Sequence, residues 1–235
     1  DGSIGLVQKP AYEDREIVTT PQPLVEEVIQ RAFDARFSAA PATSFEELCL
    51  VRVLDVAVGS GRFLVHALDK LVDTAIGILK GNPNDSRLYK VSGNEFRLRF
   101  EAKRRLLQDC LYGIDVDFNA VEVARFSLMV KLLEDVTADT LPDSKSILPN
   151  LNANVIWGNT VVGSDFDASQ DVIDETVPFD WAAEGLPSEF DVVIGNPPYV
   201  TTDDMRKANR FEFDYYKANY SSCHKQFDKY FVFIE

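Results

Sequence analysis

Four residues suited to holding a planar amino group follow an apolar run late in the chain. Asn196, Pro197, Pro198 and Tyr199 come directly after residues 190–195. Two consecutive prolines cannot continue a central strand, so they predict a stiff turn whose carbonyls have no competing donors nearby. The asparagine supplies a second acceptor and the tyrosine a flat face. The pattern predicts two acceptors beside a stacking surface, and the alternative is a turn that merely contains Pro-Pro.

A glycine-containing turn follows an earlier apolar run. Residues 50–55 read as a buried strand that ends at Asp55, and Gly59 and Gly61 come just before an amphipathic helix. Small glycines let backbone N–H groups approach a ligand, and the start of the helix adds the positive end of its dipole. The spacing is not that of a dinucleotide-binding fingerprint. An ordinary tight turn is the alternative.

A third candidate for ligand binding is Asp115, which lies at the end of the apolar run 111–115. A carboxylate in that place can accept hydrogen bonds from both hydroxyls of a ribose. The alternative is a helix cap or a surface residue, and Asp117 is better placed to be that cap. Asp115 and Asp117 together make only a weak case for a metal pair, because further ligands are absent.

No metal site is expected from the cysteines and histidines. The chain has three cysteines, no Cys-x-x-Cys pair and two histidines, which argues against structural zinc. Dispersed cysteines in a chain of this length indicate a reducing compartment, so we expect the cytoplasm. These residues are Cys49, Cys110, Cys223, His66 and His224.

Strands alternating with helices predict an α/β fold with a doubly wound, Rossmann-like sheet. The expected strands are residues 50–55, 111–115, 154–159 and 190–195, and the main expected helices are 62–71, 119–133 and 229–235. A further helix should begin with Thr20 as its N-cap and Pro21 at its first position, after Thr19. Residues 1–15 are polar and irregular, 70–109 mostly helical, and 163–191, with nine acidic residues and no Lys or Arg, form a solvated surface loop.

Composition limits the function classes. The 235 residues are 46% hydrophobic and carry a formal net charge of −14, which excludes a disordered chain and argues against a small free-standing DNA-binding domain. No apolar run approaches the roughly 20 residues that span a membrane, so no membrane partner is expected. The chain starts without Met and stops within a hydrophobic segment, which indicates a piece of a longer protein.

The order of these motifs resembles the S-adenosylmethionine-dependent N6-adenine DNA methyltransferases of the gamma class. It also resembles the methylase part of type IIG restriction-modification and BREX phage-defence enzymes, which share the long insertion at about 70–109. Val56 and Val58 depart from the Pro and Cys that are usual in the family. The motifs are Thr-Thr-Pro, DVAVGSGRFL, GIDVDFNAV, VIWGNTVV and FDVVIGNPPYV.

The resemblance implies a site for S-adenosylmethionine. Thr20 and Pro21 would contact its methionine moiety from the N-terminal segment. Asp115 would bind the ribose, Val116 would lie against the cofactor adenine, and Asn159 would meet the adenine edge. The methionine and sulfonium part would be held by Asp55, Ala57, Gly59 and Gly61.

The same resemblance implies a site for the target base. Asn196 and the Pro197 carbonyl would accept the two protons of the N6 amine, and Tyr199 would stack on an adenine flipped out of the duplex. The implied activity is adenine-specific DNA methylation. No Pro-Cys pair is present, so the cysteine nucleophile of cytosine-C5 methylation is not indicated.

The implied organisation has an N-terminal segment, 1–48, and an incomplete class I methyltransferase domain, 49–235. The partner would be double-stranded DNA, bound mainly through a target recognition domain that this sequence lacks, with further restriction or defence subunits. Two alternatives stay open. One is a methyltransferase for a protein glutamine amide or an RNA base, and the other is a non-catalytic cofactor-binding subunit.

Overall fold

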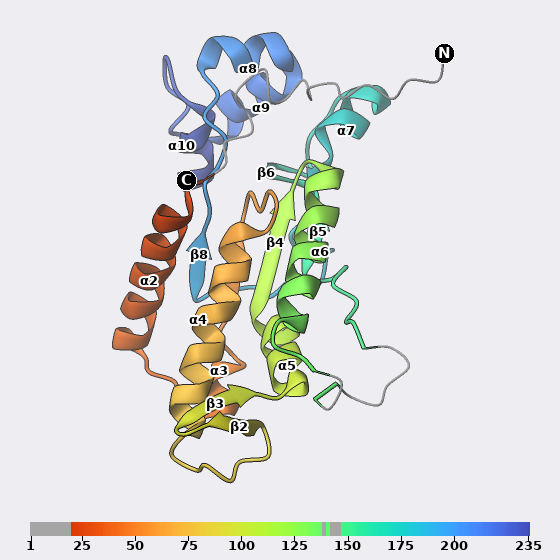
Figure 1. Cartoon of the computed structure of the whole chain (residues 1–235). Coiled ribbons are helices and arrows are strands. Elements are labelled where there is room, and N and C mark those ends of the chain that lie inside the picture. Colours follow the sequence, from red (N-terminus) through yellow and green to blue (C-terminus); the bar gives the residue numbers. More distant parts are fainter. Residues whose placement is uncertain (1–19, 138–139, 142–146) are drawn as a thin grey trace.

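The computed structural model describes residues 20–137, 140–141 and 147–235 (Figure 1). The segment 1–15, predicted to be irregular, and Thr19, predicted to precede a helix, lie outside the described residues. The helices are α2 Gln22–Ala39, α3 Phe45–Leu48, α4 Arg62–Leu79, α5 Phe100–Cys110, α6 Phe118–Leu133, α7 Gln170–Thr176, α8 Thr202–Ala208, α9 Arg210–Asn219 and α10 Lys229–Ile234. The strands are β1 Val53–Asp55, β2 Leu88–Ser92, β3 Glu95–Leu98, β4 Leu111–Asp115, β5 Val155–Trp157, β6 Asn159–Gly163, β7 Pro178–Phe179 and β8 Val192–Ile194.

The four expected strands form one parallel sheet in the order β5-β4-β1-β8. Val53 pairs with Leu111 on one side and with Val192 on the other. The predicted α/β class with a parallel central sheet is therefore confirmed. The chain order of the strands reverses at β1, and ligands of such sheets bind beyond the carboxyl ends of the strands at that point.

The two faces of the sheet are covered differently. Because side chains alternate along a strand, Val53 points into a large core shared with α2, α4 and α6, whereas Leu54 points to the other face. There Leu54 packs with Ile114, Ile156 and Phe179. Within the described residues no helix contributes to this second cluster, so the doubly wound arrangement stays a prediction.

The segment 70–109 is helical only at its two ends, which corrects the expectation. Between α4 and α5 lies an antiparallel hairpin, β2 and β3, in which Leu88 pairs with Leu98 and both are buried. Gly93 turns the chain with φ +47°. Gly-Asn between two strands is a known hairpin signal, and the sequence carries it at Gly93-Asn94.

Two further expectations need correction. The acidic segment 163–191 contains α7 and β7, and its Phe166 and Phe179 are buried because they pack against other parts of the fold. The N-cap of α2 is Pro21 rather than Thr20, and Pro21 is exposed. The side chain of Thr20 has another partner, described below.

A second core holds the last three helices at one end of the sheet. Phe213 and Tyr216 of α9 and Val232 of α10 pack with Val161 and Val162 of β6. Figure 1 shows α8, α9 and α10 at the end of the molecule opposite the β2–β3 hairpin. Among the helices of the described ranges, none has the length and apolar character needed to cross a bilayer.

Candidate functional site

A cavity of about 580 Å³ opens where β1 and β4 end. Its walls come from the N-terminal segment, the glycine turn, the start of β6, the Asn-Pro-Pro-Tyr turn and α10. The predicted site residues that line it are Thr20, Ala57, Gly59, Asp115, Val116, Asn159 and Asn196. The predicted residues outside its lining are Pro21, Asp55, Gly61, Pro197 and Tyr199. Motifs spread over most of the chain therefore meet at one cavity.

Asp55 is fully buried directly before the cavity-lining residues Val56 and Ala57. Its Oδ1 accepts the N–H of Ala57 at 3.1 Å, whereas its Oδ2 has no hydrogen-bond partner within the described structure. The pKa of Asp55 is raised to about 7, mainly by burial. The hydrogen bond from Ala57 lowers this pKa, and the charge of Asp115 raises it. A buried oxygen with spare accepting capacity fits a ligand that brings a donor or a positive charge.

The Asp115 carboxylate is held by two backbone donors. Gly59, with φ +52°, donates its N–H to Oδ2 at 2.8 Å, and Asp117 donates its N–H to Oδ1 at 2.9 Å. Each carboxylate oxygen can accept more than one hydrogen bond, which is what binding of ribose hydroxyls would require of Asp115. Asp117 caps α6 by accepting the N–H of Asn119, as predicted.

Gly61 makes room for a close helix crossing. It has φ +82°, and a Cβ there would lie 3.0 Å from the Cα of Ala124 in α6. We expect Gly61→Ala to lower the free energy of unfolding by about 1–3 kcal/mol, because both the backbone angle and the contact oppose a side chain. Urea unfolding measures this. Gly77→Ala, in the last turn of α4 with nothing within 4 Å of an added Cβ, is the matched control and should change stability by less than about 1 kcal/mol, in the stabilising direction. Equal stability of the two variants would contradict the packing role.

A chain of hydrogen bonds joins the N-terminal segment to the Asn-Pro-Pro-Tyr turn. Arg62 donates from Nη1 to the carbonyl of Thr20 at 2.8 Å, and Asn196 donates from Nδ2 to Oγ1 of Thr20 at 3.1 Å. This orientation leaves Oδ1 of Asn196 as the acceptor, where it takes the hydroxyl of Tyr199 at 2.7 Å. The ring of Tyr199 stacks on that of Tyr230, with centroids 5.4 Å apart and planes 6° apart.

Besides the predicted residue Asn159, several residues that the sequence analysis left unassigned lie at the cavity. Asn159 donates from Nδ2 to Glu212 of α9 at 3.1 Å and accepts the N–H of Val161 at 3.3 Å. Thr160 donates to the carbonyl of Val56 at 3.1 Å. The sequence signal that could have found the α10 residues is the run of aromatic side chains around Lys229. The unassigned lining residues include Arg62, Thr160, Pro198, Lys229 and Phe233.

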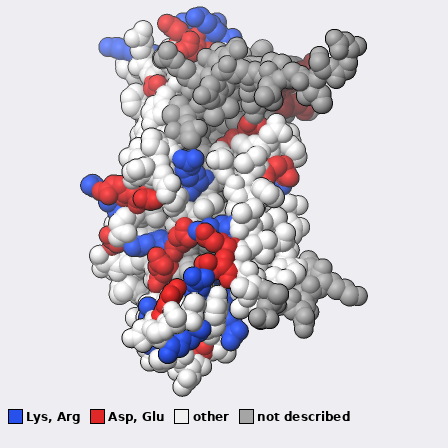
Figure 2. All heavy atoms as spheres, viewed as in Figure 1, with Lys and Arg blue, Asp and Glu red and all other residues white. Residues whose placement is uncertain are grey.

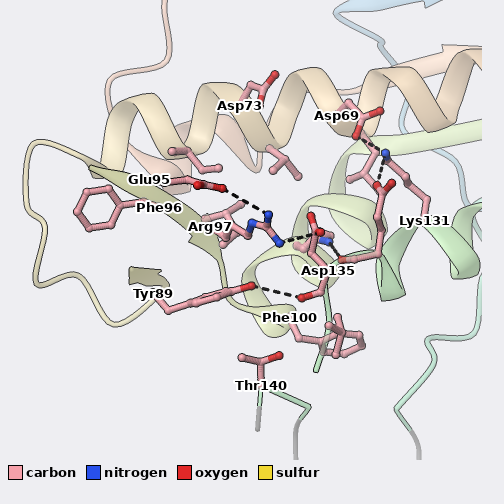
Figure 3. A pocket seen from close by; sticks show the side chains of 17 residues that line it. Asp69, Asp73, Tyr89, Glu95, Phe96, Arg97, Phe100, Lys131, Asp135 and Thr140 are labelled. Carbon is pink, nitrogen blue, oxygen red and sulfur yellow. Dashed lines mark hydrogen bonds and ion pairs between the residues drawn. The ribbon is translucent and has the colours of Figure 1, made fainter. Parts of the chain in front are cut away.

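A smaller cavity of about 320 Å³ lies beside the β2–β3 hairpin (Figure 3). Its charged side chains largely neutralise one another: Lys131 contacts Asp69 at 2.7 Å and Arg97 contacts Asp135 at 2.7 Å. Figure 2 shows acidic and basic side chains interleaved on this face of the molecule. Within the described residues no group of three or more His, Cys, Asp or Glu side chains is placed to hold a metal ion. The larger cavity is therefore the candidate site.

Residues 109–235, more than half of the chain, match the family model described as Eco57I restriction-modification methylase.

Three curated proteins are similar to the chain. The type II restriction enzyme and methyltransferase RM.Eco57I of Escherichia coli is 37% identical over 234 residues, all of this chain and 23% of that protein. The putative type II restriction enzyme and methyltransferase RM.MjaORFECS2P of Methanocaldococcus jannaschii is 35% identical over 118 residues, 50% of this chain and 9% of that protein.

The adenine-specific methyltransferase PglX of Streptomyces coelicolor is 28% identical over 201 residues, 80% of this chain and 15% of that protein. The chain thus spans at most about a quarter of the length of these relatives.

Proposed function

Because this chain belongs to the Eco57I restriction-modification methylase family, we propose that it forms the catalytic part of an adenine-specific DNA methyltransferase. The reaction transfers a methyl group from S-adenosylmethionine to N6 of an adenine flipped out of the duplex. The proposed biological setting is a restriction-modification or phage-defence system, and the name of the Escherichia coli relative supports the first of these. The observation that carries the proposal is a single cavity with Asn196 in one wall and Asp115 in another.

The residues around this cavity fit the proposed cofactor. The spare Oδ2 of Asp55 matches the positively charged methionine end, and Ala57, Gly59 and Gly61 belong to the turn that would receive it. Asp115 accepts from the ribose hydroxyls, Val116 packs against the adenine, and Asn159 meets the adenine edge. When bound, the cofactor supplies an activated methyl group on its sulfonium. Thr20 contacts the methionine moiety and Pro21, which is exposed, supports it from outside the cavity.

For methyl transfer the protein mainly has to align the target amine with the methyl group and to supply hydrogen-bond acceptors for that amine. The amino group of adenine is a weak nucleophile because its lone pair is delocalised into the ring. Asn196 Oδ1 and the carbonyl of Pro197 accept hydrogen bonds from its two N–H groups, which favours a pyramidal nitrogen and returns electron density to it. Once it carries the methyl group, the nitrogen loses one proton to solvent, and S-adenosylhomocysteine is the second product. Fixed acceptors in a preorganised site supply most of the rate gain. Asn196 donates from Nδ2 to Thr20, and in this orientation its Oδ1 is the acceptor.

Duplex DNA is the proposed partner, and we assign most of its binding to a target recognition domain outside this chain. The net charge of −14 supports that assignment, since a duplex-binding surface is normally basic, and the one face shown in Figure 2 has interleaved charges. Flipping a base costs a few kcal/mol, which stacking and edge contacts in the pocket offset.

The proposal is tested by offering the protein radiolabelled S-adenosylmethionine with duplex DNA, RNA and a glutamine-containing peptide in parallel. We expect label in DNA alone, on N6 of adenine. Label in RNA or peptide would support the corresponding alternative activity. Cofactor binding without transfer to any substrate would support a non-catalytic subunit.

Tyr199 provides a prediction about the base. Its ring is about half exposed and Tyr230 covers one of its faces, so we expect a flipped adenine to stack on the other face. Tyr199→Ala should weaken binding of the flipped base by about 1–3 kcal/mol, the usual value of one base stack. Fluorescence of 2-aminopurine placed at the target position measures flipping. Tyr199→Phe is the control and should keep stacking; equal loss in both variants would contradict this role.

A further inference from the structure

A buried cluster around Glu212 lies behind the wall of the cavity. Glu212 belongs to α9, and its side chain is only 15% exposed. Its Oε1 accepts from Nδ2 of Asn159 at 3.1 Å, from Nζ of Lys229 at 3.1 Å and from the hydroxyl of Tyr216. Lys229, also 15% exposed, and Asn159 both line the cavity. The cluster therefore connects α9 and α10 to the proposed cofactor site.

Glu212 is a carboxylate at neutral pH. Burial acts to raise its pKa, but the charge of Lys229 and the hydrogen bonds from Tyr216 and Asn159 outweigh burial and hold the pKa below the ordinary value. Burial and the neighbouring Glu212 raise the pKa of Tyr216 well above 10, so this hydroxyl keeps its proton and remains a donor. An ionised carboxylate can only accept hydrogen bonds.

An acceptor in this position fixes which way the amide of Asn159 faces. Turning the amide over would place Oδ1 against Oε1 of Glu212, with no proton between the two oxygens. The N–H of Val161 also favours the observed orientation of the Asn159 amide, because it donates to Oδ1. Asn159 therefore presents an oxygen, not an NH₂ group, on the side away from Glu212.

We propose that Glu212 is a specificity-determining positioning residue, which holds Oδ1 of Asn159 as an acceptor for the 6-amino group of the cofactor's purine. The inference rests on the proposed function, in which Asn159 meets the adenine edge. A 6-oxo purine would bring a carbonyl oxygen against that oxygen, so the site rejects it. An amide freed from Glu212 can turn at the cost of the long hydrogen bond from Val161, at 3.3 Å, and donate NH₂ to the 6-oxo group.

Calorimetric titration with S-adenosylhomocysteine and its deaminated analogue, S-inosylhomocysteine, tests this inference. The wild-type protein should bind the adenosyl compound roughly 10- to 100-fold more tightly, the usual effect of one unpaired buried polar contact. In Glu212→Gln the preference should fall to about threefold or less, because a glutamine amide can either donate to or accept from Asn159. A structural defect alone would weaken both ligands equally and leave their ratio unchanged.

Two further variants complete the design. Asp214→Asn makes the same acid-to-amide change on α9 at an exposed position paired with Arg210, and should keep the full preference. The double variant Glu212→Met with Lys229→Met replaces the buried ion pair by apolar side chains, which proteins often tolerate, and should lose the preference even where Glu212→Gln does not fold.

Retention of the full preference in folded Glu212→Gln or in the double variant would overturn the inference and leave the proposed function standing. Equal binding of both ligands by the wild-type protein would also overturn it. Failure of the wild-type protein to bind S-adenosylhomocysteine would instead contradict the proposed cofactor, and the inference would fall with it.

Discussion

Asn196→Ala should lower methyl transfer by about 10²- to 10³-fold, the usual cost of removing one preorganised group that stabilises a transition state. The substitution removes the acceptor Oδ1, which now takes the Tyr199 hydroxyl and which we assign to the target amine. Asn196 also donates to Thr20, yet the cofactor contacts proposed for Asp55 and Asp115 do not involve it. Affinity for S-adenosylhomocysteine should therefore stay within about threefold, since a single neutral hydrogen bond contributes little net free energy.

Steady-state transfer from radiolabelled S-adenosylmethionine to duplex DNA measures the first effect, and calorimetry the second. Asn82→Ala, an exposed asparagine in the loop after α4, is the matched control and should behave as wild type. Unchanged turnover in Asn196→Ala would remove Asn196 from the catalytic assignment. Loss of cofactor binding in proportion to turnover would make it a cofactor residue.

The second large effect concerns Asp55. Asp55→Asn should reduce affinity for S-adenosylmethionine at least about 100-fold, because it removes the negative charge that we assign to the cationic methionine end. The same change should stabilise the unliganded protein by roughly 1–3 kcal/mol at pH 8, because it replaces a buried carboxylate whose Oδ2 has no partner in the described structure.

The pH dependence follows from the direction of the pKa shift. The folded-state pKa of Asp55 is raised to about 7. The stability that this raised pKa contributes is fully present below the pKa of Asp55 in the unfolded chain. It is lost as the pH rises through about 7, because the buried carboxyl group then ionises. The stability gained by Asp55→Asn should therefore be larger at pH 8 than at pH 5. Cofactor affinity of the wild type should fall as pH drops through about 7, because the carboxylate takes up a proton.

Urea unfolding of both proteins at the two pH values measures the stability difference, and calorimetry over the same range measures affinity. Asp73→Asn, on the helix that follows the glycine turn, controls for removal of a carboxylate outside the larger cavity. A gain in stability that is the same at both pH values would contradict ionisation of Asp55 as its cause.

The strand ends carrying Asp55, Asp115 and Asn196 could be predicted because buried parallel strands read as short apolar runs bounded by turns. Parallel strands bring their carboxyl ends to one edge, which is why Ala57, Asp115 and Asn196, far apart in sequence, line one cavity. The hairpin at 88–98 was missed although its Gly-Asn turn was visible, because the helical pattern on both sides was extended across it.

Contacts between distant side chains could not be predicted from local pattern. The partner of Asn196 is Thr20, 176 positions earlier, and the partner of Asn159 is Glu212, 53 positions later. Neither hydrogen bond follows a regular spacing along the chain, so a single sequence gives no signal from which it could be predicted. The N-cap of α2 was misplaced by one residue for the same reason: the Thr20 hydroxyl has a tertiary partner in place of the expected backbone N–H.

Nucleoside mass spectrometry of DNA from cells that express the complete protein tests the central claim most directly, with Asn196→Ala expressed in parallel. We expect N6-methyladenine in the wild-type sample, and its loss in the variant at equal protein level. DNA without N6-methyladenine, from cells whose purified protein binds S-adenosylmethionine, would contradict adenine methylation as the function of this site.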